Sequence, residues 1–216
     1  MKDIPVFTTE HGAASLILRE IPHRQIAYIT LHDTLEPGLL LEECVGFCKA
    51  CGAEKIVAQG HDYLESFPFD AAILQMACSR SAIGQTDALA IAVTPDTLSA
   101  WRKIYNEKMA TVPHASYMTE SDGKELLAKA DGYFIYRGDR LLGIGKASDG
   151  IIHTLAAVTP GAGEAVTKAL ATILTEDTVQ LTVANTNDKA LQLYKRLGFQ
   201  ETATVSAWYR VDKEVT

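Results

Sequence analysis

The chain has 216 residues, of which 47% are hydrophobic and 22% charged, and its formal net charge is −7. This composition is that of a globular protein and excludes a chain that is disordered throughout. The acidic balance argues against a nucleic-acid-binding protein, which needs a basic face to displace counterions from phosphates. There is no apolar run of the roughly 18 residues that span a bilayer and no signal-peptide pattern, so we expect a cytoplasmic protein with reduced cysteines.

Strand-like and helix-like runs alternate in the first third of the chain. Pro22-His23-Arg24-Gln25 separates two β-leaning apolar runs and predicts a hairpin turn. Pro37 suits a first helical turn and Gly52 suits a left-handed helix end, so they bracket a helix. The expected elements are strands at residues 14–21 and 26–31, a helix over 37–51, a short buried strand at 55–58 and an apolar run of ambiguous type at 71–77.

Three of the four cysteines lie in this predicted helix, as Cys44, Cys48 and Cys51. Their spacing, Cys-x3-Cys-x2-Cys, resembles the motif with which radical S-adenosylmethionine enzymes hold a [4Fe–4S] cluster. On a helix, however, the three positions share one face with Leu41 and Val45, and free cysteine packs as a small buried hydrophobe. Cluster ligands must converge on one centre, whereas helical positions spread along the axis by about 1.5 Å per residue. We therefore expect a buried helix face and no metal, with a cluster as the alternative.

The polar stretch at residues 79–87 predicts a boundary between an N-terminal region, residues 1–85, and a larger domain, residues 86–216. The predicted order in the larger domain is β-α-α-β-β-β-α-β-α-β, which indicates a mixed α/β fold with helices on both faces of the sheet. The N-terminal region repeats the hairpin–helix–strand portion of this order and is interpreted as a partial copy. The expected elements of the larger domain are strands at 89–93, 133–136, 141–146, 151–158, 179–183 and 202–211 and helices at 96–109, 121–130, 164–174 and 188–197.

The segment from Leu181 to Phe199 carries the most information. Asn187 can cap a helix by accepting a backbone N–H, and Gly198 can close that helix. The residues on one face of this helix are Ala190, Leu193, Tyr194 and Leu197. The string L-x-V-x-x-x-N-x-x-A-x-x-L-Y-x-x-x-G-F resembles the C-terminal motif of the GCN5-related N-acetyltransferase (GNAT) superfamily. The resemblance covers about residues 87–211 and implies an enzyme that transfers an acyl group from acetyl-CoA, or a related acyl-CoA, to an amine.

A second feature of that superfamily is a pyrophosphate loop between the fourth strand and the third helix, R/Q-x-x-G-x-G/A preceded by V-x-P. Here Val158-Thr159-Pro160 matches its beginning and Gly163-Glu164-Ala165 matches its end. The loop is about three residues shorter than the pattern, and Pro160 stands where Arg or Gln is expected. A glycine-containing loop that enters a helix still presents N–H groups and a positive dipole to phosphate. A plain strand-to-helix turn is the alternative.

The resemblance gives Tyr194 the role of general acid, because the tyrosine at this position of the superfamily lies near the CoA sulfur. A phenol with a pKa near 10 keeps its proton at neutral pH, and a core tyrosine with a satisfied hydroxyl is the alternative. Asn185 contacts CoA or fixes the splay of neighbouring strands by resemblance, or else is a turn residue. By resemblance, the CoA contacts are Ala157, Val158, Pro160, Gly161, Ala162, Gly163, Glu164, Ala165, Asn185, Asn187, Ala190 and Tyr194.

An amine nucleophile must lose a proton, but the sequence identifies no general base. His153 and Asp149 lie near the start of the fourth strand, where the bases of the superfamily often occur. A structural histidine and a turn residue are the favoured interpretations of these two positions.

These observations predict an acyl-CoA-dependent N-acyltransferase in which the amine attacks directly. The expected acceptor is a small-molecule or peptide amine, without nucleic-acid or membrane partners, and a homodimer is an open alternative. The rival interpretation is a degenerate GNAT domain that binds CoA or protein partners without catalysis. The short loop favours this rival, and the intact C-terminal motif favours the enzyme.

Overall fold

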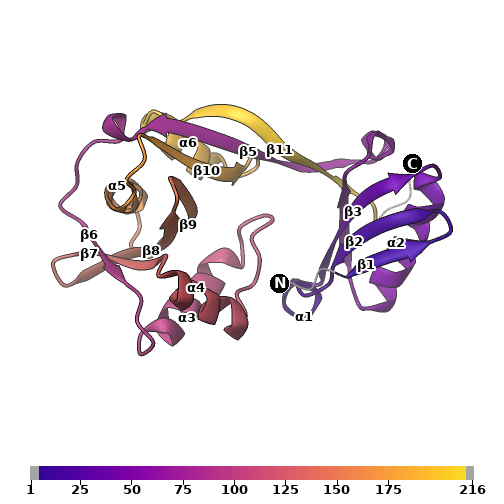
Figure 1. Cartoon of the computed structure of the whole chain (residues 1–216), viewed down its shortest axis with the longest axis horizontal. Helices are drawn as coiled ribbons and strands as arrows, with labels where there is room; N and C mark the ends of the chain where they lie inside the picture. The colour runs from indigo at the N-terminus through magenta and orange to yellow at the C-terminus, as the bar shows by residue number, and fades with distance from the viewer. Residues whose placement is uncertain (1–4, 213–216) are drawn as a thin grey trace. The chain divides into compact units, whose positions relative to one another are not determined.

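The structure is a computed structural model that describes residues 5–212, and its chain forms two compact units (Figure 1). Unit 1 comprises the chain up to Ala72 together with the segment from Val205 onward, and unit 2 comprises residues 73–204. Two long strands, β5 (Phe69–Ser79) and β11 (Gln200–Arg210), run through the two division points. The boundaries between the units therefore do not lie at residue 85. The assignment of residues 1–85 and 86–216 as domains stays a prediction.

Unit 1 is a sheet with helix α2 packed on one face. Its strands follow the order β1-β2-β3-β4-β11, and β3 and β4 are parallel with α2 as the crossover between them. The buried cluster joins apolar residues of α2 to those of β2, β3 and β4. The elements are β1 (Val6–Thr9), β2 (Gly12–Ile17), α1 (Ile21–Arg24), β3 (Ile26–Thr34), α2 (Pro37–Ala50), β4 (Lys55–Gln59) and the 3-10 helix η1 (Asp62–Ser66).

Unit 2 contains the larger sheet, with strand order β11-β5-β10-β9-β8-β7-β6. Neighbouring strands from β10 to β6 are antiparallel except β9 and β10, which are parallel and joined through α5. Besides β5 and β11, the elements are η2 (Arg80–Ala82), β6 (Leu89–Ala92), α3 (Leu98–Met109), α4 (Glu120–Lys129), β7 (Gly132–Arg137), β8 (Arg140–Ser148), β9 (Ile151–Ala157), α5 (Gly163–Ile173), β10 (Thr178–Ala184) and α6 (Asp188–Arg196).

Helices cover both faces of the unit 2 sheet. One buried cluster contains Val166 and Leu170 of α5 and extends to Tyr194 of α6. The other contains Trp101 of α3 and Leu126 of α4. Figure 1 shows α3 and α4 on one side of β7 and β8 and α5 on the other. The predicted mixed α/β fold with helices on both faces is thus confirmed.

The structure in and around unit 1 departs from the sequence-based prediction in two places and decides a third that was left open. Strand β1 was not predicted, and the expected hairpin turn at residues 22–25 lies in the short helix α1, which places Pro22 in its first turn. The ambiguous run at 71–77 belongs to the 11-residue strand β5. Propensity left the type of this run open because its pairing partner β10 lies far later in the chain.

Helix α2 confirms the helical interpretation of the cysteine stretch, since Leu41, Cys44 and Cys48 are buried. Cys51 is exposed at the C-cap, so placing it on the buried face was wrong. Among residues 5–212, no group of three or more His, Cys, Asp or Glu side chains is arranged to hold a metal ion, and the absence of a bound metal stays a prediction. None of the helices in the described part of the chain is long and apolar enough to cross a lipid bilayer.

Close packing of α5 onto β8 depends on glycine. A Cβ added at Gly143 would lie 2.5 Å from the carbonyl oxygen of Ala156 and 2.7 Å from Cγ2 of Val166. We expect Gly143→Ala to lower the free energy of unfolding by about 1–3 kcal/mol, because strand or helix must shift. The control is Gly46→Ala in α2, where nothing lies within 4 Å and where removal of a helical glycine adds about 0.5–1 kcal/mol. Denaturant unfolding measures both, and equal stability of the two variants would contradict the packing.

Thiol reactivity tests the placement of the cysteines. Burial raises the pKa of Cys44 to about 11 and that of Cys48 to about 12, and the thiolate is the reactive form. In the native protein we therefore expect rapid alkylation of Cys51 alone, and no rapid alkylation in Cys51→Ser. Intact mass after iodoacetamide treatment, with a denatured sample as the reference for all four thiols, gives the count. Rapid native labelling of Cys44 or Cys48 would be inconsistent with the buried helix face.

Candidate active site in unit 2

Strands β9 and β10 are parallel neighbours that separate after two register pairs. Those pairs are Gln180 with Ile151 and Leu181 with Ile152. Both strands continue well beyond this point, β9 paired with β8 on its other side and β10 paired with β5. The carboxyl halves of β9 and β10 therefore leave an opening in the sheet, lined by backbone groups that neither strand pairs.

Two backbone donors of β9 face this opening. The N–H of Val158 donates to the carbonyl oxygen of Leu142 in β8 at 2.8 Å. Because successive N–H groups of a strand alternate between its two sides, the N–H groups of Ala157 and Leu155 point the other way. They lie where an extended ligand inserted between the strands would meet them.

The loop from β9 to α5 is anchored to β8. The backbone N–H of Thr159 donates to the carbonyl oxygen of Leu142 at 3.1 Å, and its hydroxyl donates to that of Leu141 at 3.0 Å. The N–H of Ala162 then donates back to Thr159 at 3.1 Å. Pro160, where the superfamily pattern has Arg or Gln, and Gly161, with φ +78°, form the exposed turn between them.

Helix α5 begins without a cap. The N-cap Ala162 has no side-chain oxygen to accept a hydrogen bond. Within the described residues, the N–H groups of Gly163, Glu164 and Ala165 have no acceptor, and the first intrahelical bond runs from Val166 to Ala162. Three unpaired N–H groups at the positive end of a helix dipole form a site suited to an anion such as phosphate.

Gly163 has a packing role that its place in the motif did not indicate. A Cβ at this position would lie 2.9 Å from Cδ2 of Leu193 in α6. Its lack of a side chain therefore allows the start of α5 to approach α6. A Cβ here would require the end of the Leu193 side chain to move, so helix–helix packing favours glycine independently of any phosphate.

Helix α6 is capped, in contrast to α5. The side-chain oxygen of Asn187 accepts a hydrogen bond from the N–H of Ala190 at 3.3 Å, which confirms the predicted cap. Asn185 is half-buried just beyond the end of β10. Its position at the far side of the opening from the loop is compatible with either role predicted for it, and its contact with CoA stays a prediction.

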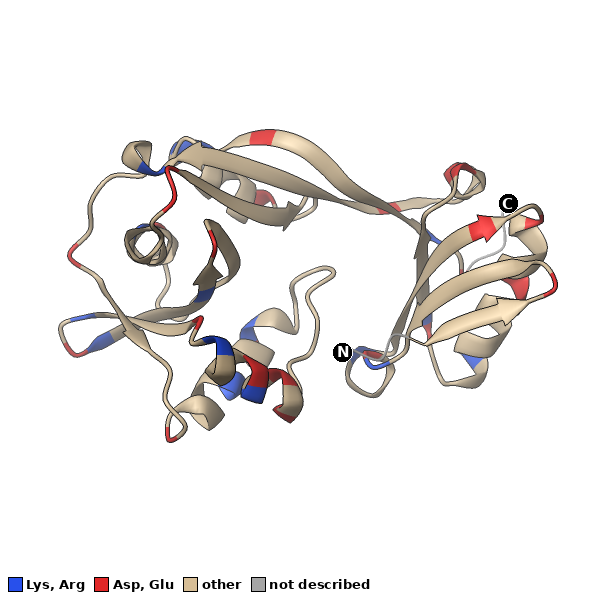
Figure 2. Ribbon diagram, in the orientation of Figure 1, with Lys and Arg blue, Asp and Glu red and all other residues tan. Residues whose placement is uncertain are grey.

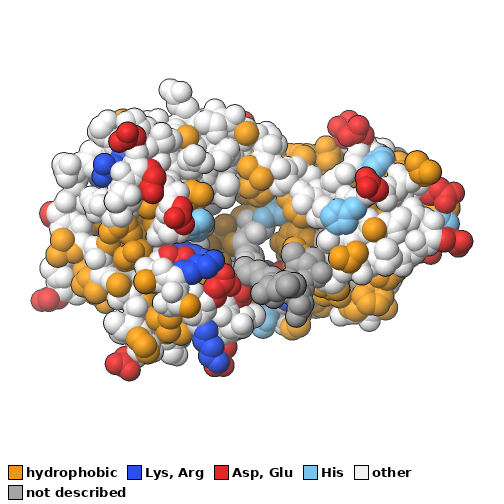
Figure 3. Space-filling model, in the orientation of Figure 1, with side chains coloured by type: hydrophobic (Ala, Val, Ile, Leu, Met, Phe, Trp, Pro, Cys, Tyr) orange, Lys and Arg blue, Asp and Glu red, His pale blue; other side chains and the backbone are white. Residues whose placement is uncertain are grey.

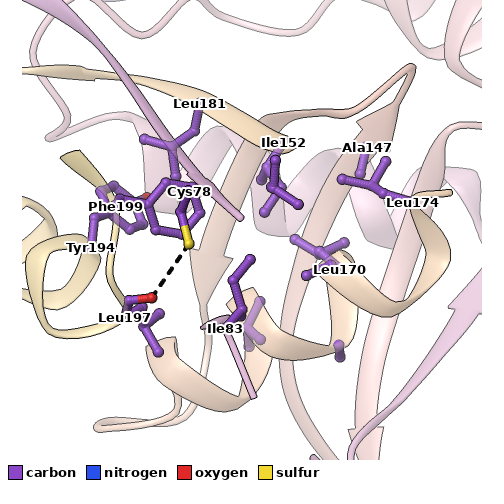
Figure 4. Packing of buried hydrophobic residues seen from close by; sticks show 14 of the residues in the cluster. Cys78, Ile83, Ala147, Ile152, Leu170, Leu174, Leu181, Tyr194, Leu197 and Phe199 are labelled. Atoms are coloured by element: carbon purple, nitrogen blue, oxygen red, sulfur yellow. Dashed lines mark hydrogen bonds between the residues drawn. The ribbon is translucent and has the colours of Figure 1, made fainter. Parts of the chain in front are cut away.

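Tyr194 lies in the apolar core between α6 and the sheet. Its side chain is 7% exposed and its ring lies 5.8 Å from that of Phe199; Figure 4 shows both rings beside Leu181 and Cys78. Burial raises the pKa of Tyr194 to about 12, so the phenol stays protonated far above neutral pH. Within the described residues its hydroxyl has no hydrogen-bond partner, so its proton is not committed to a fixed acceptor.

A pocket of about 680 Å³ adjoins the start of α5. It extends from the loop Pro160–Ala162 to the β7–β8 turn, and its basic lining residues are Arg137, Arg140 and Lys168. The ribbon in Figure 2 shows basic residues at both ends of that turn. The sequence-based prediction missed these three residues, although two of them flank a recognisable turn and Lys168 follows Glu164 by one helical turn.

His153 and Asp149 lie at the other end of β9. The imidazole Nε2 of His153 is 3.1 Å from the hydroxyl of Ser148. Partial burial, and then the charge of Lys146, lowers the pKa of His153, so it is neutral at pH 7. Lys146 is itself paired at 3.3 Å with Asp131, which is 2% exposed. His153 therefore lies next to the paired start of β9 and β10 and not at the opening between their carboxyl halves.

Acidic side chains are distributed over the visible surface of both units and form no single patch in Figure 3. The pocket thus has three basic lining residues in a chain whose net charge is −7.

The chain is similar to several known proteins. The profile of a family described as FR47-like protein matches residues 157–209. A GCN5-related N-acetyltransferase from Sphaerobacter thermophilus is similar in structure, with 15% identity, a TM-score of 0.58, and coverage of 94% of this chain and 76% of that one. A putative acetyltransferase from Pyrococcus horikoshii gives 12% identity, a TM-score of 0.60, and coverage of 95% and 70%.

A protein of unknown function from Staphylococcus epidermidis gives 13% identity, a TM-score of 0.59, and coverage of 96% of this chain and 93% of that one. A comparison with curated proteins finds no match. At these identities the structural likenesses establish the fold, and they confirm the resemblance to the GNAT superfamily on which the sequence analysis relied.

Proposed function

We propose that this chain, which has the fold of the GNAT superfamily, is an acyl-CoA-dependent N-acyltransferase. In the proposed reaction an acetyl group passes from acetyl-CoA to a primary amine by direct attack. The observation that carries the proposal is the opening between β9 and β10 beside an uncapped helix N-terminus. The opening would hold the extended part of the ligand that carries the thioester, and the helix N-terminus would hold the phosphates of the same ligand.

The residues present fit acetyl-CoA as a cosubstrate. The N–H groups of Gly163, Glu164 and Ala165 would hold the pyrophosphate, because they are unpaired donors at the positive end of α5. The N–H groups of Leu155 and Ala157 would polarise the thioester carbonyl, since fixed donors stabilise the negative charge that develops on its oxygen. The acceptor, a small-molecule or peptide amine, is part of the proposal.

Tyr194 would supply the proton to the departing thiolate. A phenol whose pKa is raised to about 12 is fully protonated at pH 7 to 9. It would donate this proton as the C–S bond breaks and recover one from the nitrogen that has attacked the carbonyl, so that the amine's proton ends on the CoA thiol. Its position in α6, which packs against the start of α5 through Leu193 and Gly163, places it in the same part of unit 2 as the opening. The rival function, CoA or protein binding without catalysis, is favoured by the short loop and by Pro160.

The backbone donors of α5 can be tested by removing one N–H. Glu164→Pro deletes the N–H while keeping a residue that a first helical turn tolerates. The matched control is Glu164→Ala, which removes the same carboxylate and its 2.7 Å pair with Lys168 but keeps the N–H. We expect Glu164→Pro to bind acetyl-CoA roughly tenfold or more weakly than Glu164→Ala, since a hydrogen bond to a charged group contributes about 1.5–3 kcal/mol.

Calorimetric titration gives both affinities, and melting curves confirm that the variants are folded. Equal affinities of the proline and alanine variants for acetyl-CoA would mean that the pyrophosphate does not bind at the N-terminus of α5. No detectable binding of acetyl-CoA to the unchanged protein would reject the proposed function.

The role of Tyr194 is tested with Tyr194→Phe, which keeps the packed ring and removes the proton donor. We expect kcat with an amine acceptor to fall by about 10² to 10⁴, with little change in acetyl-CoA affinity. The loss should be present across pH 7 to 9, because the tyrosine is protonated throughout this range. Steady-state kinetics and calorimetry measure the two quantities. If kcat is unchanged, Tyr194 is a packing residue and another group protonates the thiolate.

A further inference from the structure

The side of helix α2 that faces away from the unit 1 sheet carries few polar residues. Six exposed residues recur there at helical spacing and are called the outer face of α2: Leu39, Glu42, Glu43, Gly46, Phe47 and Ala50. Leu39 is 46% and Phe47 42% exposed. Because the opposite side of the helix is buried and also apolar, α2 is apolar nearly all round, which is typical of a helix that is covered on every side.

Helices α3, α4 and α5 carry balanced charges instead. Each has lysine and glutamate side chains paired one helical turn apart: Lys103–Glu107, Glu120–Lys124, Glu125–Lys129 and Glu164–Lys168. On the outer face of α2 the charged residues are Glu42 and Glu43, and within residues 5–212 neither carboxylate forms an ion pair or a hydrogen bond. The outer face of α2 therefore combines apolar side chains with two uncompensated negative charges.

The negative charge extends past the start of α2. His11, in the turn between β1 and β2, has its Nδ1 2.6 Å from the carboxylate of Glu36, the N-cap residue of α2. The hydrogen bond with Glu36, followed by the charges of Glu36 and Glu43, raises the pKa of His11 above its usual value. A cation placed near the outer face of α2 is therefore attracted by several carboxylates of unit 1.

Apolar side chains continue on both sides of the outer face. The ring of Phe47 lies 5.3 Å from that of Phe7 in β1, which holds the Phe47 side chain in place. Leu35, just before the helix, is 99% exposed. On the other side the phenol of Tyr63 lies against Gly38 in the first turn of α2, where a Cβ would be 3.1 Å from its oxygen. An apolar surface of this extent, with a charged part, is typical of a site of protein interaction.

The middle of the outer face is open enough to admit another helix. A Cβ added at Gly46 would meet nothing within 4 Å, and Ala50, one turn later, has a small side chain. Leu39 and Ala50 are eleven residues apart, which corresponds to about 17 Å along the helix axis. Small residues at the contact permit a short distance between two helix axes. The outer face thus fits a helix of about three turns or more.

Charge decides between two possible occupants of this face. In a symmetric pair of copies of this chain, the same face lies on both sides, so Glu42 and Glu43 would approach the same carboxylates of the second copy. Each copy also has a net charge of −7, and like charges across an interface are unfavourable. A basic segment meets the two carboxylates with opposite charge, so charge complementarity favours a different, basic partner.

We propose that the outer face of α2 is a docking site for a basic amphipathic helix of another protein. Apolar side chains of that helix pack on Leu39 and Phe47 across the open space at Gly46, in the manner of an amphipathic helix laid on an apolar surface. Its lysine or arginine side chains pair with Glu42 and Glu43. The site lies in unit 1 and does not depend on the proposed acyl transfer, which rests on unit 2.

Two synthetic 18-residue helical peptides serve as probes. Both carry leucine at i, i+3, i+4 and i+7 positions, and the remaining positions are lysine in one peptide and glutamate in the other. Fluorescence anisotropy of the labelled peptides measures their affinities for the full chain. We expect the lysine peptide to bind the unchanged protein about tenfold or more tightly than the glutamate peptide, and added salt to reduce this difference.

Gly46→Lys places a bulky cation in the middle of the face, where there is room for it in the unbound protein. We expect it to weaken binding of the lysine peptide about tenfold or more. The matched control is Ala100→Lys, which adds the same charge at an exposed position of α3 and should leave the affinity unchanged. Melting curves confirm that both variants are folded.

The double variant Glu42→Gln/Glu43→Gln should weaken binding of the lysine peptide about threefold or more, because two exposed ion pairs are lost. Its control, Asp96→Asn/Glu201→Gln, removes two exposed carboxylates of unit 2 and should have no effect. The proposal is overturned if the lysine peptide does not bind the unchanged protein, or if the controls weaken binding as much as the α2 variants. A dimer in sedimentation that Gly46→Lys converts to a monomer would also overturn it, by assigning this face to a second copy.

Discussion

The separation of β9 and β10 after two register pairs is the constraint on which the candidate active site depends. A strand in the middle of a sheet can leave one neighbour if its other neighbour holds it. Seven register pairs join β10 to β5, and β9 is paired with β8 along its length. The opening is therefore fixed by rigid strands on both sides. Unpaired N–H groups can face it without loss of the surrounding sheet.

Unit 1 repeats the frame of this arrangement. In unit 1, β2 and β3 are antiparallel, β3 and β4 are parallel across α2, and β4 is antiparallel to β11. In unit 2, β8 and β9, β9 and β10 across α5, and β10 and β5 have the same three relations. This equivalence supports the interpretation of the N-terminal region as a partial copy. It also accounts for where the two units divide the chain, since β5 and β11 each follow the third strand of one copy and run on through a division point.

Local signals allowed most of the site-bearing segment to be predicted. The helix at 188–196 was expected because Asn187 and Gly198 mark its ends, and α5 because a proline–glycine turn precedes an apolar helical face. What could not be predicted depends on pairing between distant segments. The number of residues over which β9 and β10 remain paired cannot be predicted from the amino-acid composition of either strand. Likewise, Arg140 and Lys168 share a pocket only because α5 packs on β8, which the small residues Gly143 and Gly145 permit.

The repeated frame does not imply a repeated site, because the corresponding positions in unit 1 are closed. Strands β3 and β4 stay in register over five pairs. Beyond them Gly60, at φ +100°, lets the carbonyl of Leu31 approach to a position that a Cβ would occupy, so no slot opens. Helix α2, which connects β3 to β4, begins after Glu36. The carboxylate of Glu36 lies 2.6 Å from His11 and places a negative charge at the helix end where a phosphate would have to bind. Both requirements, an open strand pair and a helix end free for an anion, are met together in unit 2. That coincidence, rather than the fold alone, is the physical ground for the proposal that unit 2 carries acyl-CoA chemistry.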